Sequence, residues 1–103
     1  MSVIEVNKGN FEEVVLKSEV PVLADFNAGW CGPCRAMKPM LDELAEGNTA
    51  YKIVSIDIDD EDELADEYDV SSIPCLVVFK GGEEVNRSVG LIARDAIAEL
   101  VEG

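Results

Sequence analysis

The feature that most constrains the fold is the short apolar segment Pro21-Val22-Leu23-Ala24-Asp25-Phe26, in which Asp25 is the only charged residue. A nearly unbroken apolar run that begins at a proline is typical of a strand buried in a parallel sheet. Residues 31–46 follow closely and carry apolar side chains at the spacing of a helix. A buried strand that leads into a helix predicts an α/β domain.

The rest of the chain continues this alternation of strands and helices. We expect a tight turn at residues 80–83, further strands at 3–6, 51–58, 75–79 and 84–89, and further helices at 11–16, 60–68 and 93–101. The side chains of the C-terminal region expected to face inward are Ile92, Ala96, Ile97 and Leu100. This order predicts parallel crossover units closed by an antiparallel hairpin. Because 103 residues leave no room for a second core, residues 1–103 are expected to form a single domain.

The composition is that of a globular protein and limits its partners. The 48% apolar content is ordinary, and a domain of this size buries enough surface to fold without disulfides. The net charge of −14 argues against binding to nucleic acid or to an anionic membrane, because phosphate groups are repelled. The absence of histidine removes the commonest metal ligand and the usual general base.

The first residues and the cysteine count bear on the compartment. The sequence does not open with a basic segment followed by an apolar run, so we expect no export signal. No apolar stretch approaches the roughly 18 residues that a membrane span requires. Three cysteines in an unexported chain argue for reactive or metal-binding thiols and against a framework of structural disulfides. We therefore expect a cytoplasmic protein.

The pentapeptide Trp30-Cys31-Gly32-Pro33-Cys34 lies between the buried strand and its helix. Pro33 suits the first helical turn, and two cysteines three apart on a turn bring their Cα atoms near the ~5.5 Å that a disulfide prefers. Cys31 is expected to lie over the unpaired N–H groups at the helix start, which favour the thiolate that attacks disulfides. Cys34, one turn further along and expected to be more buried, is then the resolving thiol.

A Cys-x-x-Cys motif alone leaves other functions open. It is also half of many zinc sites, but this chain would need Cys75 and a carboxylate, or a second chain, to complete four ligands. Two cysteines that merely pack in the core fit poorly beside Trp30, Gly32 and Pro33, which we expect to be exposed. The candidate functions are a redox carrier, a metal or iron–sulfur module, and a non-catalytic interaction domain, of which the intact cysteine pair disfavours the last.

Several motifs in the same order and spacing resemble the thioredoxin family along nearly the whole chain. They are the Trp-Cys-Gly-Pro-Cys segment after the Val-Leu-Ala-Asp-Phe strand, Ser72-Ile73-Pro74, Phe79-Lys80-Gly81-Gly82 and Val89-Gly90. The resemblance implies the thioredoxin fold, an α/β domain with a central mixed five-stranded sheet flanked by four helices. It also implies that Cys31 and Cys34 reduce protein disulfides by dithiol–disulfide exchange, without a metal or other cofactor. The implied partners are a thioredoxin reductase and disulfide-containing client proteins, with the chain acting as a monomer.

The same resemblance assigns roles to residues around the cysteine pair. Asp25 matches a buried acid of the family; burial should raise its pKa, which suits a proton acceptor for Cys34. Pro74 is expected to follow a cis peptide bond that faces the cysteines. The residues expected to line a groove for an extended substrate are Trp30, Gly32, Pro33, Ile73, Pro74, Cys75 and Gly90.

Four positions depart from the family pattern. Cys75 stands where the family usually has threonine, and we expect it to shape the substrate groove without joining the relay. Ser55 stands where many relatives have a lysine thought to pair with the buried acid, so Asp25 should be less compensated. Asn27 and Gly29 replace bulkier residues and predict a more open surface before Trp30.

The segment from residue 57 to residue 69 is strongly acidic, with nine carboxylates in thirteen residues. It lacks the central glycine and the twelfth-position glutamate of an EF-hand, which disfavours a calcium loop. We expect a solvated helix whose first-turn acids complement the helix dipole, with Asp60 and Glu63 spaced as a capping box.

Overall fold

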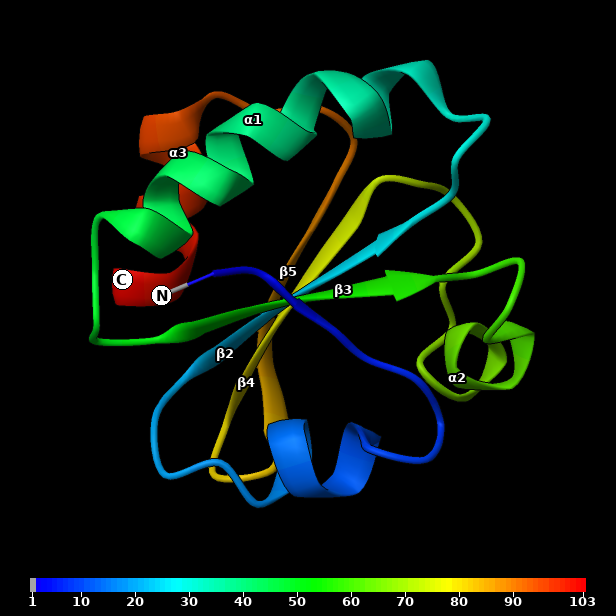
Figure 1. Ribbon diagram of the computed structural model, residues 1–103, viewed down its shortest axis with the longest axis horizontal. Helices are drawn as coiled ribbons and strands as arrows, with labels where there is room; N and C mark the ends of the chain where they lie inside the picture. The colour runs from blue at the N-terminus through cyan, green and yellow to red at the C-terminus, as the bar shows by residue number, and fades with distance from the viewer. Residues whose placement is uncertain (1) are drawn as a thin grey trace.

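The five strands form one mixed sheet in the order β1-β3-β2-β4-β5 (Figure 1). A computed structural model describes residues 2–103. The strands are β1 (Ile4–Glu5), β2 (Val22–Asn27), β3 (Lys52–Asp57), β4 (Cys75–Lys80) and β5 (Glu83–Val89). The first three run parallel to one another, whereas β4 is antiparallel to β2 and to β5. The predicted crossover units and closing hairpin are confirmed.

Four helices flank this sheet on two sides. They are the short π-type helix η1 (Glu12–Leu16) and the α-helices α1 (Gly32–Glu46), α2 (Asp62–Glu67) and α3 (Arg94–Glu102). Figure 1 shows α1 and α3 together on one side of the sheet, and α2 and the blue helix η1 on the other. The arrangement is the five-stranded mixed sheet with four helices that the family resemblance implies.

The alternation of side chains along β2 divides the core into two layers. Val22, Ala24 and Phe26 pack in the layer that also contains residues of η1 and α2. Leu23 packs in the other layer, against side chains of α1 and α3. Because successive strand residues point to opposite faces, Asp25 shares the α1 face with Leu23. The strand that buries the core therefore also aims a carboxylic acid at the helix that carries the cysteines.

The acidic helix α2 begins later than expected and lacks the predicted capping box. Its N-cap is Glu61, whose side chain makes no capping hydrogen bond. The backbone N–H of Lys8 donates to the Glu61 carboxylate, and the Lys8 ammonium group contacts Glu63. The prediction that Asp60 and Glu63 cap this helix was wrong, because the Glu63 carboxylate binds a cation from the N-terminal segment instead.

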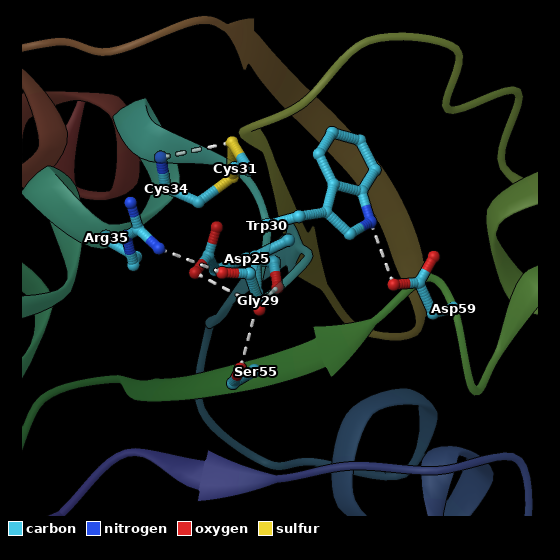
Figure 2. Close-up of a disulfide and its surroundings, with 9 residues drawn as sticks. Asp25, Gly29, Trp30, Cys31, Cys34, Arg35, Ser55 and Asp59 are labelled. Atoms are coloured by element: carbon cyan, nitrogen blue, oxygen red, sulfur yellow. Dashed lines mark hydrogen bonds between the residues drawn. A yellow bond between two sulfur atoms is a disulfide. The ribbon is translucent and has the colours of Figure 1, made fainter.

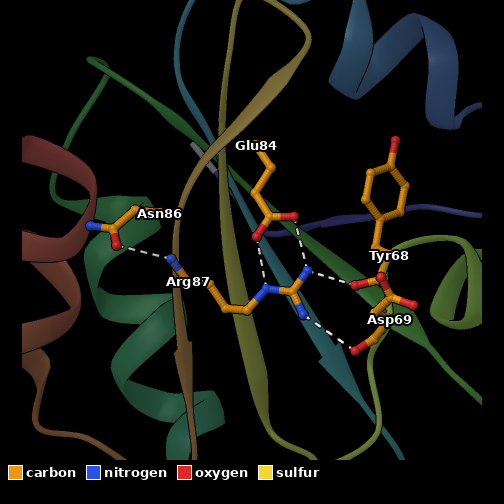
Figure 3. Close-up of polar contacts among 5 residues, drawn as sticks. All are labelled: Tyr68, Asp69, Glu84, Asn86 and Arg87. Carbon is orange, nitrogen blue, oxygen red and sulfur yellow. Dashed lines mark hydrogen bonds and ion pairs between the residues drawn. The ribbon is translucent and has the colours of Figure 1, made fainter.

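Arg87 of β5 ties the sheet to the C-terminal end of α2 (Figure 3). Its guanidinium forms two hydrogen bonds with the Glu84 carboxylate, at 2.7 and 2.9 Å. It also donates to the backbone carbonyl oxygens of Tyr68, at 2.6 Å, and Asp69, at 3.4 Å. Asp69 has a positive φ of 55°, so the chain turns sharply here on leaving the helix. One side chain thus binds the two carbonyl groups that directly follow the last residue of this short helix.

Across residues 2–103, no helix combines the length and the apolar character needed to cross a lipid bilayer.

Candidate active site

Cys31 and Cys34 form a disulfide at the junction between β2 and α1 (Figure 2). Their Cα atoms are 5.2 Å apart, within the range that disulfides prefer. Cys31 is the N-cap of α1, and its sulfur accepts a hydrogen bond from the Cys34 backbone N–H at 3.2 Å. Pro33 occupies the first turn, where its missing N–H leaves no gap in the helix. The sequence prediction that Cys31 lies over the helix N-terminus is confirmed.

The two cysteines are equally buried, which differs from the sequence prediction. Each has only 5% of its surface exposed, and both pack with Ala28 and the partly buried Ile58 and Ile73. The prediction that Cys34 is the more buried of the two was wrong for this disulfide form, because the bonded sulfurs cover each other. The two sulfurs differ instead in what surrounds them.

Asp25 is the only buried charged side chain among residues 2–103, with 5% of its surface exposed. Burial raises the pKa of Asp25 to about 7; a hydrogen bond from Asn27 acts in the opposite direction, and the charge of Glu5 adds to the increase. Its Oδ1 atom is buried and makes no hydrogen bond within the described chain. The predicted rise in pKa is confirmed, and the cause is the predicted one.

The amide of Asn27 connects Asp25 to Ser55. The two hydrogens of its Nδ2 atom are shared among three acceptors, the Asp25 carbonyl oxygen at 2.9 Å, Ser55 Oγ at 2.8 Å and, most distant, Asp25 Oδ2 at 3.3 Å. Ser55 lies directly beside Asp25 in the register of β2 and β3. Asn27 and Ser55 were singled out in the sequence only for the bulk and the charge that they lack; that they bind each other, and that Asn27 binds the buried acid, was not predicted.

A cavity of about 460 Å³ lies between α1 and the sheet. Both Asp25 and Cys34 line it, together with other residues of β1, β2, β3 and α1 that include Asn27, Arg35, Lys38 and Ser55. Cys31 is not among its lining residues. The buried acid and the second cysteine therefore open onto one shared space, whereas the first cysteine occupies the helix N-terminus.

The Ile73–Pro74 peptide bond is cis, as the family resemblance implies. Ile73 packs against the buried cysteine cluster, which places this turn beside the disulfide. The Pro74 carbonyl oxygen accepts a hydrogen bond from the Gly90 N–H at 2.8 Å. Gly90 has a φ of 98°, a conformation that side chains other than glycine rarely adopt. Pro74 and Gly90 are thus held together at one end of the hairpin.

Trp30 is 67% exposed beside the cysteine pair, and its indole is anchored by the acidic segment. The indole Nε1–H donates to Asp59 Oδ2 at 2.9 Å, and Figure 2 shows this contact bridging two loops. Trp30 is exposed, as predicted, but its partner Asp59 was not predicted, because nothing in the local pattern singles out one acid among nine.

Cys75 is brought near the cis-proline turn, but its thiol lies in the interior. Only 1% of its surface is exposed, and it packs in the core layer of η1 and α2 with Val77 and Phe79. Asp25 faces the opposite side of the sheet. Burial raises the pKa of the Cys75 thiol, an effect that Arg87 partly offsets. Among residues 2–103, no group of three or more histidine, cysteine or acidic side chains is placed to hold a metal ion.

Comparison with known proteins identifies the family. The thioredoxin family model matches residues 2–103. The chain is 42% identical over 102 residues to a thioredoxin of Pyropia yezoensis, which covers 98% of this chain and 95% of the relative. It is 39% identical over 99 residues to thioredoxin 1 of a Nostoc species, covering 95% of this chain and 92% of the relative.

A solved structure agrees with these sequence comparisons. A mutant thioredoxin from Halobacterium salinarum superimposes with a TM-score of 0.90 at 38% identity, covering 98% of this chain and 88% of that one. The match in fold, in sequence along nearly the full length and in the cysteine pair at the helix N-terminus leads to one conclusion. The chain belongs to the thioredoxin family and is a thiol–disulfide oxidoreductase whose redox-active disulfide is Cys31–Cys34.

Proposed function

We propose that this chain reduces the disulfides of client proteins by a two-step relay in which Cys31 attacks and Cys34 resolves. The observation that carries the proposal is the difference between the surroundings of the two sulfurs. Cys31 accepts an N–H at the helix N-terminus, whereas Cys34 shares a cavity with the buried Asp25. The first environment favours a thiolate, and the second offers a proton acceptor.

In the first step, the Cys31 thiolate attacks one sulfur of the client disulfide. A bond forms between Cys31 Sγ and that sulfur, the client disulfide breaks, and the departing client thiolate takes a proton from water. The N–H groups at the start of α1 stabilise the negative charge on Cys31 before the attack. The product is a mixed disulfide between this chain and its client.

In the second step, Cys34 resolves the mixed disulfide. Asp25 in its carboxylate form accepts the Cys34 thiol proton, and Cys34 Sγ then attacks Cys31 Sγ. The Cys31–Cys34 disulfide forms, the bond to the client breaks, and the second client thiolate takes up a proton. Two electrons have passed from the cysteine pair to the client. With a pKa near 7, Asp25 can accept the Cys34 proton and can also lose it again at neutral pH, which restores the carboxylate for the next cycle.

The client segment is proposed to lie in a groove beside the disulfide. Trp30, Gly32 and Pro33 are exposed on one side of the pair, and the turn at Ile73 and Pro74, joined to Gly90, forms the other. Because its thiol is buried, Cys75 is proposed to support the strand beneath this turn and to take no part in the relay.

The partners and compartment follow from this chemistry. After each cycle the Cys31–Cys34 disulfide needs two electrons and two protons, which we propose a thioredoxin reductase supplies. A disulfide reductase requires a reducing compartment, and a third, unbonded cysteine is compatible with one, so we propose the cytoplasm. We further propose that the chain acts as a monomer without a cofactor.

Trapping of the mixed disulfide tests the order of the two cysteines. In a Cys75→Ser background, Cys34→Ser should accumulate client proteins bound through Cys31, because attack persists while resolution fails. Multiple-turnover reduction of a protein disulfide should be lost. Non-reducing electrophoresis followed by mass mapping of the crosslinked cysteine measures both the amount and the site.

The matched control is Cys31→Ser in the same background, which should trap no client. Equal trapping by Cys31→Ser would reverse the assignment. Stoichiometric zinc or iron in the purified wild-type protein would favour the metal-binding alternative. Assays with flavin-linked and ferredoxin-linked reductases identify the electron donor.

A further inference from the structure

We infer that Asn27 is a positioning residue for the proton acceptor: its amide, anchored on Ser55, fixes one oxygen of Asp25 and leaves the other free to receive the proton of Cys34. The inference rests on the role proposed for Asp25 in resolution. It assigns a function to two residues that the cysteine motif does not include.

The amide of Asn27 is held in place by contacts stronger than the one it makes to the carboxylate. Its Nδ2 atom lies 2.8 Å from Ser55 Oγ and 2.9 Å from the Asp25 carbonyl oxygen, both good hydrogen-bond distances. The Asn27 carbonyl oxygen accepts the Ile58 N–H at 2.9 Å, which fixes the backbone as well. Contacts with β2 and β3 therefore hold the Asn27 amide in place, at a position 3.3 Å from Asp25 Oδ2.

The contact divides the carboxyl group into two unequal oxygens. Oδ2 faces Asn27, whereas Oδ1 is buried and has no hydrogen-bond partner within the described chain. An unpaired buried oxygen is costly, and it is the more available site for an incoming proton. Because Asp25 and Cys34 line the same cavity, the Cys34 thiol that appears on reduction shares one space with a carboxyl group whose Oδ1 is unpaired.

The two cationic side chains that line the cavity with Asp25 bind other groups. Arg35 Nη1 donates to the Gly29 carbonyl oxygen at 3.4 Å, and Lys38 Nζ pairs with Asp42 at 3.4 Å. Among residues 2–103, Asn27 is then the only side-chain donor within hydrogen-bond distance of the Asp25 carboxyl group. The carboxylate of Asp25 is therefore stabilised by a hydrogen bond from a neutral amide and not by an ammonium or guanidinium group.

Other charges and titratable groups face Asp25 from every element around it. They are Glu5 on β1, Asp57 on β3, and Cys34, Arg35, Lys38, Asp42 and Glu46 on α1, whereas Cys75 on β4 lies on the opposite face of the sheet. Four of the six charged groups are acidic; the charge of Glu5 opposes ionisation of Asp25, and the hydrogen bond from Asn27 favours it. None of these groups is altered by a substitution at Asn27.

The experiment compares Asn27→Leu, which keeps the approximate volume but donates no hydrogen bond, with the wild-type protein. The titration of Asp25 is followed by carboxyl-carbon NMR, and the rate of mixed-disulfide resolution is followed from pH 5 to 9. Loss of the donor disfavours the carboxylate, so both midpoints should move up by about one pH unit. Resolution at pH 6.5 should then be slower by up to about tenfold, and the rate should recover at high pH.

Two further variants make the result specific. Ser55→Ala removes only an anchor of the Asn27 amide and should move both midpoints in the same direction by a smaller amount. It replaces Asn27→Leu as the test variant if Asn27→Leu folds poorly. Asn86→Leu is the matched control, because Asn86 lies on β5 and the hydrogen bonds of its side chain within residues 2–103 are to the Leu100 carbonyl oxygen and the Arg87 N–H. It should leave both midpoints unchanged.

The outcomes separate this inference from the proposed function. Unchanged midpoints in both Asn27→Leu and Ser55→Ala, with Asp25→Asn still slow in resolution, would overturn the role of Asn27 alone. Wild-type resolution by Asp25→Asn would instead remove Asp25 from the mechanism. If the NMR titration midpoint of Asp25 moves but the pH midpoint of the resolution rate does not, the amide acts on stability and not on the relay, and the inference is overturned.

Discussion

At the scale of single residues, Asp25 carries opposite consequences for stability and for reactivity. The folded chain buries this carboxyl group, and burial raises its pKa from 3.8 to about 7. Between about pH 4 and pH 7, the folded state therefore keeps a proton on Asp25 that the unfolded state has already lost. By linkage, the free energy of unfolding decreases as the pH rises from about 4 to about 7, and this contribution is then constant.

Asp25→Asn should consequently stabilise the protein at alkaline pH. The difference of about three pH units corresponds to at most about 4 kcal/mol at pH 8, and the gain should shrink toward zero at pH 4. Urea unfolding of the oxidised protein at several pH values measures this effect. The variant Asp62→Asn, on the surface of α2, also removes one acidic charge but should change stability by well under about 1 kcal/mol. A gain from Asp25→Asn that is equal at pH 4 and pH 8 would contradict the argument.

At the scale of secondary-structure elements, the short helix α2 depends on a side chain from another element. It contains six residues and has no side-chain cap at its N-terminus. An isolated helix of this length is unstable in water. The Arg87 guanidinium supplies donors to the carbonyl groups at its C-terminal end, as Figure 3 shows, and the Tyr68 ring packs against Phe11 and Phe79 in the core.

Removal of the Arg87 side chain should therefore cost more than removal of its ion pair. We expect Arg87→Ala to lower the free energy of unfolding by about 2 kcal/mol, because two carbonyl groups lose a charged donor. Glu84→Gln, which weakens only the i,i+3 pair, should cost about 0.5 kcal/mol or less. Chemical unfolding curves of both variants provide the comparison. Equal losses would mean that the ion pair, and not the helix end, accounts for the stability.

The elements themselves were largely predictable, and the side-chain partners between them were not. The strand at residues 21–26 and the helix after it follow from apolar periodicity, which is a local property of the sequence. Ala96 was expected to face inward but is exposed, because the buried stripe of α3 runs through Ile97 and Val101, four residues apart. A one-residue error in phase around a helix is enough to place an alanine on the wrong side.

In the candidate site too, single residues were predictable from the sequence and the contacts between distant residues were not. Cys31, Cys34 and Asp25 could be located from the motif and from a charge in an apolar strand. The contact from Asn27 to Ser55 joins residues 28 positions apart, and that from Trp30 to Asp59 joins residues 29 apart. These contacts depend on the register of β2 with β3 and on the path of the following loop, which no local pattern contains.

At the scale of the whole molecule, the charge is strongly one-sided. The chain has 22 acidic and 8 basic side chains, and its ion pairs are mostly exposed. Exposed pairs contribute little, whereas the excess of like charges destabilises the compact state. Screening by salt weakens both effects, and the repulsion is the larger one.

Melting temperature should therefore rise with salt. Between about 0.01 and 1 M ionic strength the screening length falls from about 30 to about 3 Å, which removes most repulsion between surface carboxylates. We expect a higher melting temperature in sodium chloride by several degrees, measured by calorimetry at pH 7. Sucrose at matched osmolality controls for solvent exclusion. A melting temperature that falls with sodium chloride would show that attractive pairs dominate.

The position of Trp30 gives the molecule an intrinsic optical signal. It is the chain's single tryptophan, it is 67% exposed, and it directly precedes Cys31 in the sequence. Its indole also binds Asp59, so one fluorophore is bonded to the acidic segment and belongs to the residue next to Cys31 in the chain. Emission excited at wavelengths that the two tyrosines do not absorb thus comes from one known site, and changes in oxidation state or client docking can be followed there without an attached dye.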